Sequence, residues 1–470
     1  MVGLSMVTYL DRVNISIAAR YITSAYGLSD VQMGKIFSAF IFAYGLFQLP
    51  GGWLGDRYGP RKILTAAIIW WSAFTALTAC ATNILPPKII PAMYSLIFVR
   101  FMMGAGEAAA WPNFNRTIAS WMNVKDRAFA SSLPLAGGGL GGALTPPFIG
   151  WIMLKYGWRE SFYASAILGV VAASLWYLIA RDTPEKHPWV NAAELRAIRS
   201  GVNAPSASAL SAGESSAPAS GSEANAKADS HASVDNTEGN YVRTSTTSPS
   251  LTPAATAPAR ATRTPWRAIF TNRNTWLLFC SAATCGYLVY IYMTWFYVYL
   301  TEARGLPKMR GAYFTAGPYL AMALMTPLGG LLGDYLTRRF GKTTGRRTVS
   351  MLGMFTAGLA LFAGVFVANI HIAIIGLSIG GGAIYFALSS HWATTIDISR
   401  KHAGTVSGIM NWGGNVGGIS SPILTPILAH KLGWNPALAV GGVIIIAGGL
   451  LWFFVQPENG LADDRLTTAN

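Results

Sequence analysis

Residues 51–56 read Gly-Gly-Trp-Leu-Gly-Asp, and residues 329–334 read Gly-Gly-Leu-Leu-Gly-Asp. A second set of residues repeats at almost the same separation along the chain. Its members are Gly141, Gly142, Pro146, Lys155, Gly157 and Trp158, which correspond in order to Gly417, Gly418, Pro422, Lys431, Gly433 and Trp434. So many coincidences at nearly one spacing predict a duplicated unit, in which the two halves of the chain share one fold.

The composition indicates that both halves lie in a membrane. The chain has 470 residues, of which 52% are hydrophobic and 12% are charged, whereas a soluble globular protein has about 25% charged residues. Twelve apolar runs are long enough to cross a bilayer, which takes about 20 residues in a helix. They cover residues 1–22, 31–54, 62–81, 92–116, 128–153, 160–180, 275–300, 312–333, 348–368, 371–396, 404–429 and 436–456. We therefore predict an all-α membrane protein with twelve transmembrane helices in two six-helix pseudo-repeats, and a soluble enzyme is excluded.

The segment between the two sets of runs has a different composition. Residues 200–264 are rich in Ser, Ala, Thr and Pro and contain almost no large apolar residue, so they cannot form a core. We predict an N-terminal six-helix bundle over 1–199, a disordered cytoplasmic linker over 200–266 and a C-terminal six-helix bundle over 267–470. The linker is either a passive tether or a regulatory, phosphorylated segment.

Basic residues gather in the loops on one side of the predicted bundle. These loops contain Arg57, Arg61, Lys62, Lys125, Arg127, Arg338, Arg339, Lys342, Arg346, Arg347, Arg400 and Lys401. The opposite loops contain fewer, namely Lys88, Lys155, Arg159, Lys308 and Arg310. By the positive-inside rule the first side faces the cytoplasm, and both termini lie there. Membrane orientation thus explains the net charge of +15 without a nucleic-acid partner.

The first predicted span has only ten residues before Asp11. A span needs about 20 residues, and no basic segment of a signal peptide is visible. We expect an upstream translation start, with about ten further helix residues before Met1.

Two acidic residues, Asp11 and Glu107, fall well within apolar runs. A charged side chain at that depth costs on the order of 2.5–3.5 kcal/mol on insertion, so such residues are expected to be paired and functional. Basic partners are available in Arg12 and Arg100. Adjacent residues of a helix point about 100° apart, so Asp11 and Arg12 must find partners on other helices. The preferred arrangement pairs Asp11 with Arg100, and pairs Arg12 with Glu107 or a bound anion. A salt bridge that only fixes helix packing is the alternative.

Polar residues recur at helical spacing on six of the predicted spans, which suits a ligand with hydroxyl or carbonyl groups. In addition to the two arginines, the candidates for substrate binding are Tyr9, Tyr44, Gln48, Tyr290, Ser390, Trp392 and Asn411. His391 is either a second proton carrier or a hydrogen-bonded structural residue.

The loop motif at residues 52–62 reads Gly-Trp-Leu-Gly-Asp-Arg-Tyr-Gly-Pro-Arg-Lys. Its glycines permit helices to approach closely, and its aspartate can cap or bridge a neighbouring helix in one conformation only. We interpret the motif as a conformational latch formed by Gly52, Gly55, Asp56, Arg57, Gly59 and Arg61.

This motif, with its partial copy at residues 329–347, resembles the signature loop of the major facilitator superfamily. The run Tyr-Leu-Asp-Arg-Val-Asn-Ile-Ser at 9–16, together with residues 37–40 and 48–52, resembles the anion:cation symporter family within it. That family includes bacterial sugar-acid transporters and the vesicular glutamate and sialic acid carriers. The resemblance covers the chain apart from the linker.

The resemblance implies proton-coupled uptake of a small organic anion, a sugar acid or related carboxylate, by alternating access across a bacterial-type inner membrane. In similar sugar-acid transporters, the positions that match Asp11 and Glu107 carry protons. The positions that match Arg12 and Arg100 serve substrate binding or gating.

The resemblance also implies that Tyr9, Tyr44 and Asn411 line the substrate site. The chain departs from the sugar-acid pattern in the fifth span, where residues 137–139 are three glycines and such transporters often carry a glutamine. This departure counts against an aldonate substrate.

Electrostatics alone could couple protons to the anion. A dry environment favours the neutral form of a carboxyl group, whereas a neighbouring arginine favours the charged form. One proton for each monoanion makes transport electroneutral. Two protons would let the membrane potential drive uptake, because moving one charge across 100 mV is worth about 2.3 kcal/mol.

Other functions are weighed against this reading. An organophosphate:phosphate antiporter would use a basic residue from each half, but residues 275–300 contain no Lys or Arg. The two buried arginines disfavour a drug:proton antiporter, and a non-transporting nutrient receptor would bind its ligand without proton-linked flux. The spans show no nucleophile–base pair, metal-ligand cluster or nucleotide-binding loop, so we predict no enzyme activity, metal or cofactor. The expected partners are the anion, protons and the lipid bilayer, and the chain is expected to be a monomer.

Overall fold

The structure is a computed structural model that describes residues 1–84, 91–122, 127–199, 266–399 and 402–458. The linker predicted over 200–266 lies outside these residues except for its last position, and so do the loop residues Lys88, Lys125, Arg400 and Lys401. All the regular secondary structure in the described residues is helical. The described parts of both halves belong to one compact unit.

The first half follows the predicted order of spans closely. Its long helices are α1 (Val2–Tyr26), α2 (Asp30–Tyr58), α3 (Pro60–Ile84), α4 (Ala92–Glu107), α5 (Ala110–Trp121), α6 (Arg127–Lys155) and α7 (Trp158–Ile179). The run expected at 92–116 is divided into α4 and α5 by a turn at residues 108–109. A 3₁₀ turn (Pro184–Lys186) and the short helix α8 (Ala192–Arg199) complete this half.

The second half repeats the plan. Its helices are α10 (Trp266–Thr271), α11 (Arg273–Thr294), α12 (Phe296–Val298), α13 (Lys308–Phe340), α14 (Lys342–Phe366), α15 (Ile370–Ile398), α16 (Ala403–Leu432) and α17 (Trp434–Leu450). A π-helical turn (Tyr299–Ala303) extends α12, and a 3₁₀ turn (Leu451–Phe453) follows α17. Each run expected in this half therefore coincides with a helix or with an interrupted pair of helices.

Seven helices in the described part of the chain are long and apolar enough to cross a membrane by length and composition alone. They are α2, α7, α11, α14, α15, residues 60–81 of α3, and residues 434–453, which comprise α17 and its terminal turn. The remaining predicted spans are less apolar or are interrupted. For example, α1 contains Asp11, Arg12 and Arg20, and α4 ends before the turn that leads into α5.

Turn chemistry explains where α1 ends and α2 begins. Gly27 follows α1 in the left-handed conformation, with a φ of 64°, which glycine adopts without a Cβ clash. Ser29 then caps α2, because its side chain accepts a hydrogen bond from the Gln32 N–H at 3.2 Å and Gln32 Oε1 accepts one from the Ser29 N–H at 2.8 Å. This capping box satisfies two N–H groups that would otherwise lack partners.

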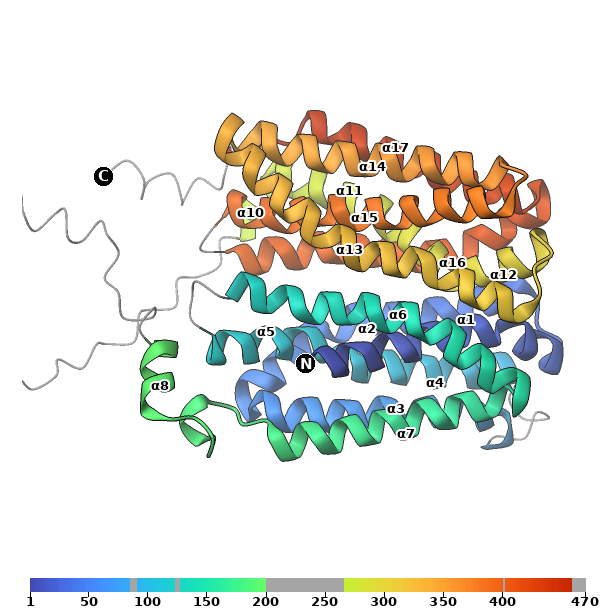
Figure 1. Ribbon diagram of the computed structural model, residues 1–470, viewed down its shortest axis with the longest axis horizontal. Helices are drawn as coiled ribbons and strands as arrows, with labels where there is room; N and C mark the ends of the chain where they lie inside the picture. The colour runs from blue at the N-terminus through green and yellow to red at the C-terminus, as the bar shows by residue number, and fades with distance from the viewer. Residues whose placement is uncertain (85–90, 123–126, 200–265, 400–401, 459–470) are drawn as a thin grey trace, which may run out of the picture. The chain divides into compact units, whose positions relative to one another are not determined.

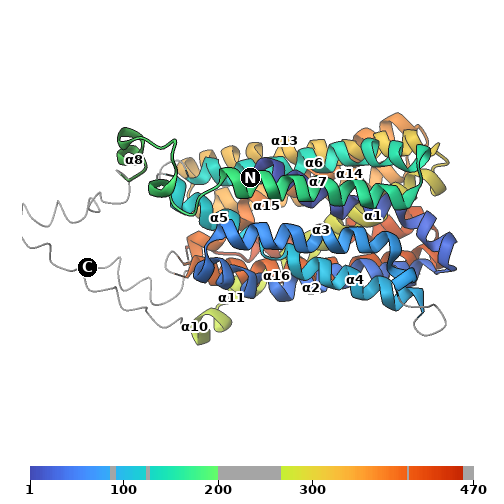
Figure 2. The ribbon, with the colours of Figure 1, turned by 90° about the horizontal axis from the view of Figure 1, so that it is seen from below.

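Two helix pairs form the most extensive contacts between the described parts of the halves. Helix α6 packs against α13, and α2 packs against α16. Figure 1 shows the first half in blue to green and the second half in yellow to red, with α6 beside α13, and Figure 2 shows α2 near α11 and α16. The residues that carry charge inside the bundle lie on α1 and α4, next to this contact zone.

Candidate functional site

A buried ion pair joins α1 to α4. Arg12 Nε donates to Glu107 Oε1 at 2.5 Å, and the two side chains are 8% and 0% exposed. The predicted pairing of Arg12 with Glu107 is therefore confirmed. Glu107 Oε2 and Arg12 Nη2 are buried and have no hydrogen-bond partner among the described residues. The pair therefore keeps one acceptor and one donor that another group can engage.

Asp11 lies in a different place from the one expected. Its carboxylate is buried beside Trp71 and Thr75 of α3, and among the described residues neither oxygen has a hydrogen-bond partner. The expected ion pair with Arg100 is absent from the described part of the chain. Because successive residues of a helix point about 100° apart, α1 turns Asp11 toward α3 when Arg12 faces α4.

Arg100 is a buried cation that forms no ion pair with a carboxylate of the described residues. It is 2% exposed, and its Nη1 lies 2.9 Å from the Met103 sulfur, a weak acceptor. Its Nε has no partner among the described residues. The guanidinium lies 4.9 Å from the centre of the Phe40 ring, which gives a favourable cation–π contact. A buried guanidinium with a free N–H is suited to hold an anion.

Both arginines line one small cavity of about 20 Å³ between α1, α2, α4 and α11. Its polar lining comes from Arg12, Arg100, Tyr290 and Thr294. Its apolar lining comes from Ile15, Phe37, Phe40, Ile41 and Met293. The residues of both halves contribute, so the cavity lies where the duplicated units meet. We call it the arginine cavity.

Three aromatic rings surround the Arg12 guanidinium. Its central carbon lies 4.4 Å from the centre of the Tyr44 ring, 5.3 Å from that of Phe40 and 5.8 Å from that of Tyr9. Phe37, Phe40 and Tyr44 fall at i, i+3 and i+7 on α2. This aromatic stripe is the sequence signal that could have identified Phe37 and Phe40 as site residues.

Two hydrogen bonds between the halves lie next to these rings. The hydroxyls of Tyr9 and Tyr385 are 3.2 Å apart, and Asn411 Nδ2 donates to Gln48 Oε1 at 2.8 Å. The first pair borders a second, smaller cavity of about 10 Å³ between α1, α6, α13 and α15. The structure thus brings these predicted site residues together, and it adds Tyr385, which sequence reasoning missed.

Ser390 and Trp392 do not join this group. The Ser390 hydroxyl donates to the Arg346 carbonyl at 2.9 Å and so faces α14. Trp392 is on the same face of α15 as Tyr385, two turns farther along, and its side chain is exposed. Of the two cavities described, neither is lined by Ser390 or Trp392.

His391 is enclosed within the second half. Its Nδ1 lies 3.0 Å from the Ala387 carbonyl, and its Nε2 lies 3.0 Å from the Ser281 hydroxyl. The imidazole also contacts the Trp452 ring edge-on, with centroids 4.7 Å apart. Both ring nitrogens are therefore engaged in contacts that pack α11, α15 and the end of α17 together.

The motif at 52–62 joins α2 and α3 to α5 and to the end of α7. Asp56 forms an ion pair with Arg116 of α5. A Cβ at Gly51 would lie only 2.7 Å from the Ala109 backbone, and one at Gly52 would lie 3.2 Å from Pro112. The glycines are thus required because α2 and α5 are in close contact. The predicted bridge from Asp56 to a neighbouring helix is present.

The second part of the motif contacts the end of α7. Gly59 has a φ of 90°, which a residue with a side chain rarely adopts. The Arg61 N–H donates to Asp182 Oδ1 at 2.9 Å, and the Arg61 side chain donates to the Tyr177 carbonyl. Arg57 is exposed and packs over the rings of Trp53 and Tyr58.

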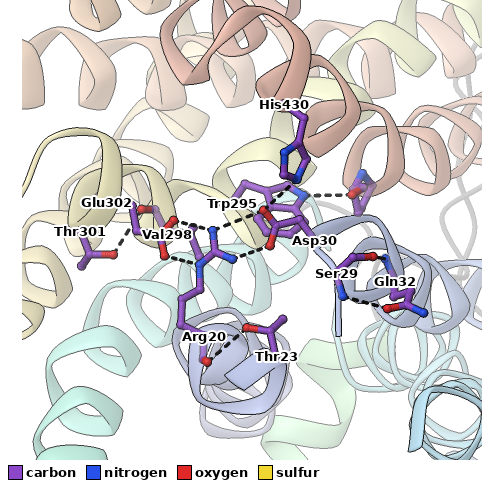
Figure 3. Close-up of polar contacts among 11 residues, drawn as sticks. Arg20, Thr23, Ser29, Asp30, Gln32, Trp295, Val298, Thr301, Glu302 and His430 are labelled. Carbon is purple, nitrogen blue, oxygen red and sulfur yellow. Dashed lines mark hydrogen bonds and ion pairs between the residues drawn. The ribbon is translucent and has the colours of Figure 1, made fainter. Parts of the chain in front are cut away.

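A cluster of charged side chains joins the halves at the other end of the bundle. Arg20 of α1 pairs with Asp30 at the start of α2 and with Glu302 in the π-helical turn. His430 near the end of α16 lies 3.6 Å from Asp30. Figure 3 shows these side chains converging. We call them the gate cluster. On the α2–α16 side, the hydrogen bonds between described residues of the two halves extend from this end only as far as Gln48 and Asn411.

The family profile of the Major Facilitator Superfamily matches residues 1–418 and 319–468. The chain belongs to the Major Facilitator Superfamily. It is accordingly a multi-pass membrane transporter and not an enzyme, and the predicted twelve-helix fold is confirmed.

Curated relatives match the chain over nearly its whole length. The probable sulfoacetate transporter SauU of Cupriavidus necator is 30% identical over 96% of this chain and 91% of its own. The probable galactarate/D-glucarate transporter GudP of Bacillus subtilis is 29% identical over 96% and 89%. The hexuronate transporter of Bacillus subtilis is 27% identical over 97% and 93%.

Among solved structures, the fold is similar to that of a bacterial homologue of the human lysosomal transporter Spinster, in an inward-facing and unoccupied conformation. The TM-score is 0.68 with 17% sequence identity, over 97% of this chain and 95% of that chain. This likeness concerns the fold.

Proposed function

We propose that the protein is a proton-coupled symporter that imports a small organic anion by alternating access. The observation that carries this proposal is the arginine cavity, where two buried guanidinium groups with free N–H donors, from Arg12 and Arg100, meet residues of both halves. Buried charges in a membrane bundle are expected to be paired and functional. An anionic substrate would accept hydrogen bonds from the N–H groups of Arg12 and Arg100 that have no partner among the described residues.

The names of the relatives support an anionic substrate. Sulfoacetate, galactarate, D-glucarate and hexuronate are all organic acids. They share the negative sign of charge that the cavity would hold but differ in the number of charged groups, in size and in hydroxyl content. The proposal that the substrate is negatively charged therefore rests on the relatives and on the cavity together.

The gate cluster supports alternating access. We infer that the end with the 52–62 motif faces the cytoplasm, because basic loop residues gather there. The gate cluster then lies at the outer end, where it holds the two bundles, 1–199 and 267–470, together. In this arrangement the cavity would open toward the cytoplasm after the contacts nearer that end separate.

Asp11 and Glu107 are the groups we propose for proton coupling. Both are buried within reach of the electrostatic field of Arg100, and each has at least one oxygen without a hydrogen-bond partner among the described residues. Anion binding at Arg12 would compete with Glu107 for the guanidinium. A carboxylate released from its cation inside a dry bundle favours protonation. Two such groups suit two protons for each monoanion.

Uptake into liposomes tests the proposed function. Purified protein is reconstituted and offered radiolabelled sulfoacetate, galactarate and benzoate with an inward pH gradient. We expect at least one anion to accumulate in protein-containing liposomes and not in protein-free ones. A cationic substrate alone, or binding of an anion without flux, would contradict the proposal.

Weakening the gate cluster should shift the protein toward its outward-open state. The Glu302→Gln substitution removes an exposed ion pair with Arg20, which contributes up to about 1 kcal/mol, or about fivefold in an equilibrium constant. We expect an impermeant thiol reagent to label Thr294→Cys up to about fivefold faster from outside, in a background without the three native cysteines. The exposed Glu194→Gln serves as the control, and slower labelling of the gate variant would contradict the assignment.

Breaking the latch should slow transport without unfolding the protein. Asp56→Asn removes the ion pair with Arg116, in which both side chains are exposed, so the free energy of unfolding should change by less than about 1 kcal/mol. We expect the rate of uptake to fall severalfold. The comparison is Arg196→Gln, an exposed arginine of α8 that contacts a carbonyl of its own helix. An unchanged rate in Asp56→Asn would show that the contact is only structural.

A further inference from the structure

The walls of the arginine cavity are mostly apolar. Apart from the two arginines, its lining consists of aromatic and aliphatic side chains with a single tyrosine and a single threonine. The centre of the Phe40 ring lies near both guanidinium groups, 5.3 Å from that of Arg12 and 4.9 Å from that of Arg100. The cavity therefore offers two positive charges and a mostly apolar surface. A polyhydroxylated ligand would find few neutral hydrogen-bonding groups in this lining.

Several neutral polar groups in and near the cavity already have hydrogen-bond partners. The Thr294 hydroxyl donates to the Tyr290 carbonyl at 2.5 Å. The Gln48 and Asn411 amides bond to each other, and the hydroxyls of Tyr9 and Tyr385 are paired. A hydroxyl group brought against these paired groups would have to break one of their contacts, which is unfavourable in a dry environment. Arg12 Nη2, Arg100 Nε and Glu107 Oε2 have no partner among the described residues, but the charged groups of the anion and the coupled proton compete for these atoms.

The glycines of α6 prevent a further polar side chain from reaching the neighbouring second cavity, beside Tyr9. A Cβ at Gly138 would lie 2.5 Å from the Tyr9 ring, and one at Gly139 would lie 2.6 Å from the Cβ of Ala323 on α13. A side chain at either position would displace Tyr9 or separate α6 from α13. The close packing between α6 and its neighbours therefore requires glycine at these two positions. As a result, residues 137–139 of α6 contribute no hydrogen-bonding side chain.

We propose that the arginine cavity selects a compact organic anion with an apolar body over a polyhydroxylated sugar acid of the same length and charge. The proposal rests on the proposed function and narrows its substrate class. Phe37, Phe40 and Met293 determine this preference by facing the body of the anion, while Arg12 and Arg100 hold its charged groups. An apolar pocket rejects added hydroxyl groups only moderately, by up to about 100-fold.

Matched pairs of anions test the preference. Adipate and galactarate are six-carbon dicarboxylates that differ only in four hydroxyl groups, and hexanoate and gluconate differ in five. Binding of each to the purified protein in detergent is measured by thermal shift and by isothermal calorimetry. We expect adipate and hexanoate to bind at least about tenfold more tightly than their hydroxylated partners.

A substitution in the wall links the preference to this cavity. Met293→Gln adds an amide of nearly the same length and should narrow the difference between adipate and galactarate by about tenfold. Met293→Leu conserves volume and apolarity, so it should keep the difference. Loss of folding would weaken the binding of adipate and galactarate alike, so a narrowed difference with glutamine and an unchanged difference with leucine would point to the cavity wall.

The outcomes separate this inference from the proposed function. Tighter binding of galactarate and gluconate would overturn the inference and leave the organic-anion transporter in place. Equal effects of the glutamine and leucine variants would show that Met293 does not face the anion body and would also overturn it. No binding of any of the four anions would overturn the inference, whereas the proposed function would fail only if the liposomes accumulated no organic anion.

Discussion

The Asp11→Asn and Glu107→Gln variants are expected to lose concentrative uptake while they retain exchange of anion across the membrane. A pH difference of one unit supplies about 1.4 kcal/mol for each coupled proton, which is about a factor of 10 in the accumulated concentration. A variant that cannot bind the proton loses this factor. Exchange needs no net proton movement, and the amide side chains have nearly the size of the carboxyl groups they replace.

The measurement compares uptake and counterflow in the same liposomes. Uptake is followed with an inward pH gradient, and counterflow is followed with unlabelled anion inside and no gradient. Glu194→Gln, an exposed acid in the first turn of α8, is the matched control and should behave like the unchanged protein. Full accumulation by the Asp11→Asn, Glu107→Gln double variant would refute the assignment of these residues.

The Arg100→Gln variant is expected to bind anions at least about 30-fold more weakly, because removing a buried partner of a charged ligand costs about 2–5 kcal/mol. Arg100 is the stronger choice for this test, since Arg12 also holds Glu107 at 2.5 Å. Arg100→Lys should recover part of the affinity, because it restores the charge without the planar donor geometry. Binding is measured by calorimetry with the anion that the liposome screen identifies.

The matched control is Arg310→Gln, an exposed arginine near the start of α13. It removes the same charge from the chain but lies outside both cavities. If Arg100→Gln bound the anion as tightly as Arg310→Gln, the arginine cavity would not be the substrate site. The thermal stability of both variants is compared in parallel, so a folding defect would be visible.

The order and approximate limits of the helices could be predicted from sequence because hydropathy and length set them. The interruptions could not. The turn between α4 and α5 and the π-helical end of α12 depend on how neighbouring helices pack, which a single sequence does not encode as a local pattern. Helix α1 illustrates the opposite case, since its buried charges lower its hydropathy while its packing against α6 and α7 retains it in the bundle.

The candidate site was predictable where helical phase and charge agree. Arg12 and Glu107 are charged residues within apolar runs, where each is stable only with a partner of opposite charge. The two side chains form this ion pair with each other. The prediction of an Asp11–Arg100 ion pair was wrong because such a pair depends on how each helix is rotated about its own axis. Helix α1 directs Asp11 toward Trp71 and Thr75 of α3. Charge complementarity alone does not fix that rotation.

Ser390 and Trp392 show the same difficulty on α15. Both are polar or aromatic residues late in a span, yet Ser390 points toward α14, where it bonds to the Arg346 carbonyl. Tyr385 occupies the position opposite Tyr9 instead. The choice among residues of one helix requires knowing which neighbour covers each face.

The central claim is that proton movement through Asp11 and Glu107 drives an anion held by Arg12 and Arg100. The most direct measurement is the steady-state ratio of internal to external anion in liposomes, first with a pH difference of one unit and then after an ionophore collapses it. With the gradient we predict that each coupled proton raises the ratio by a factor of about 10. When the gradient is removed, the ratio should fall to its equilibrium value without a proton gradient. An equal ratio in both conditions would contradict the account.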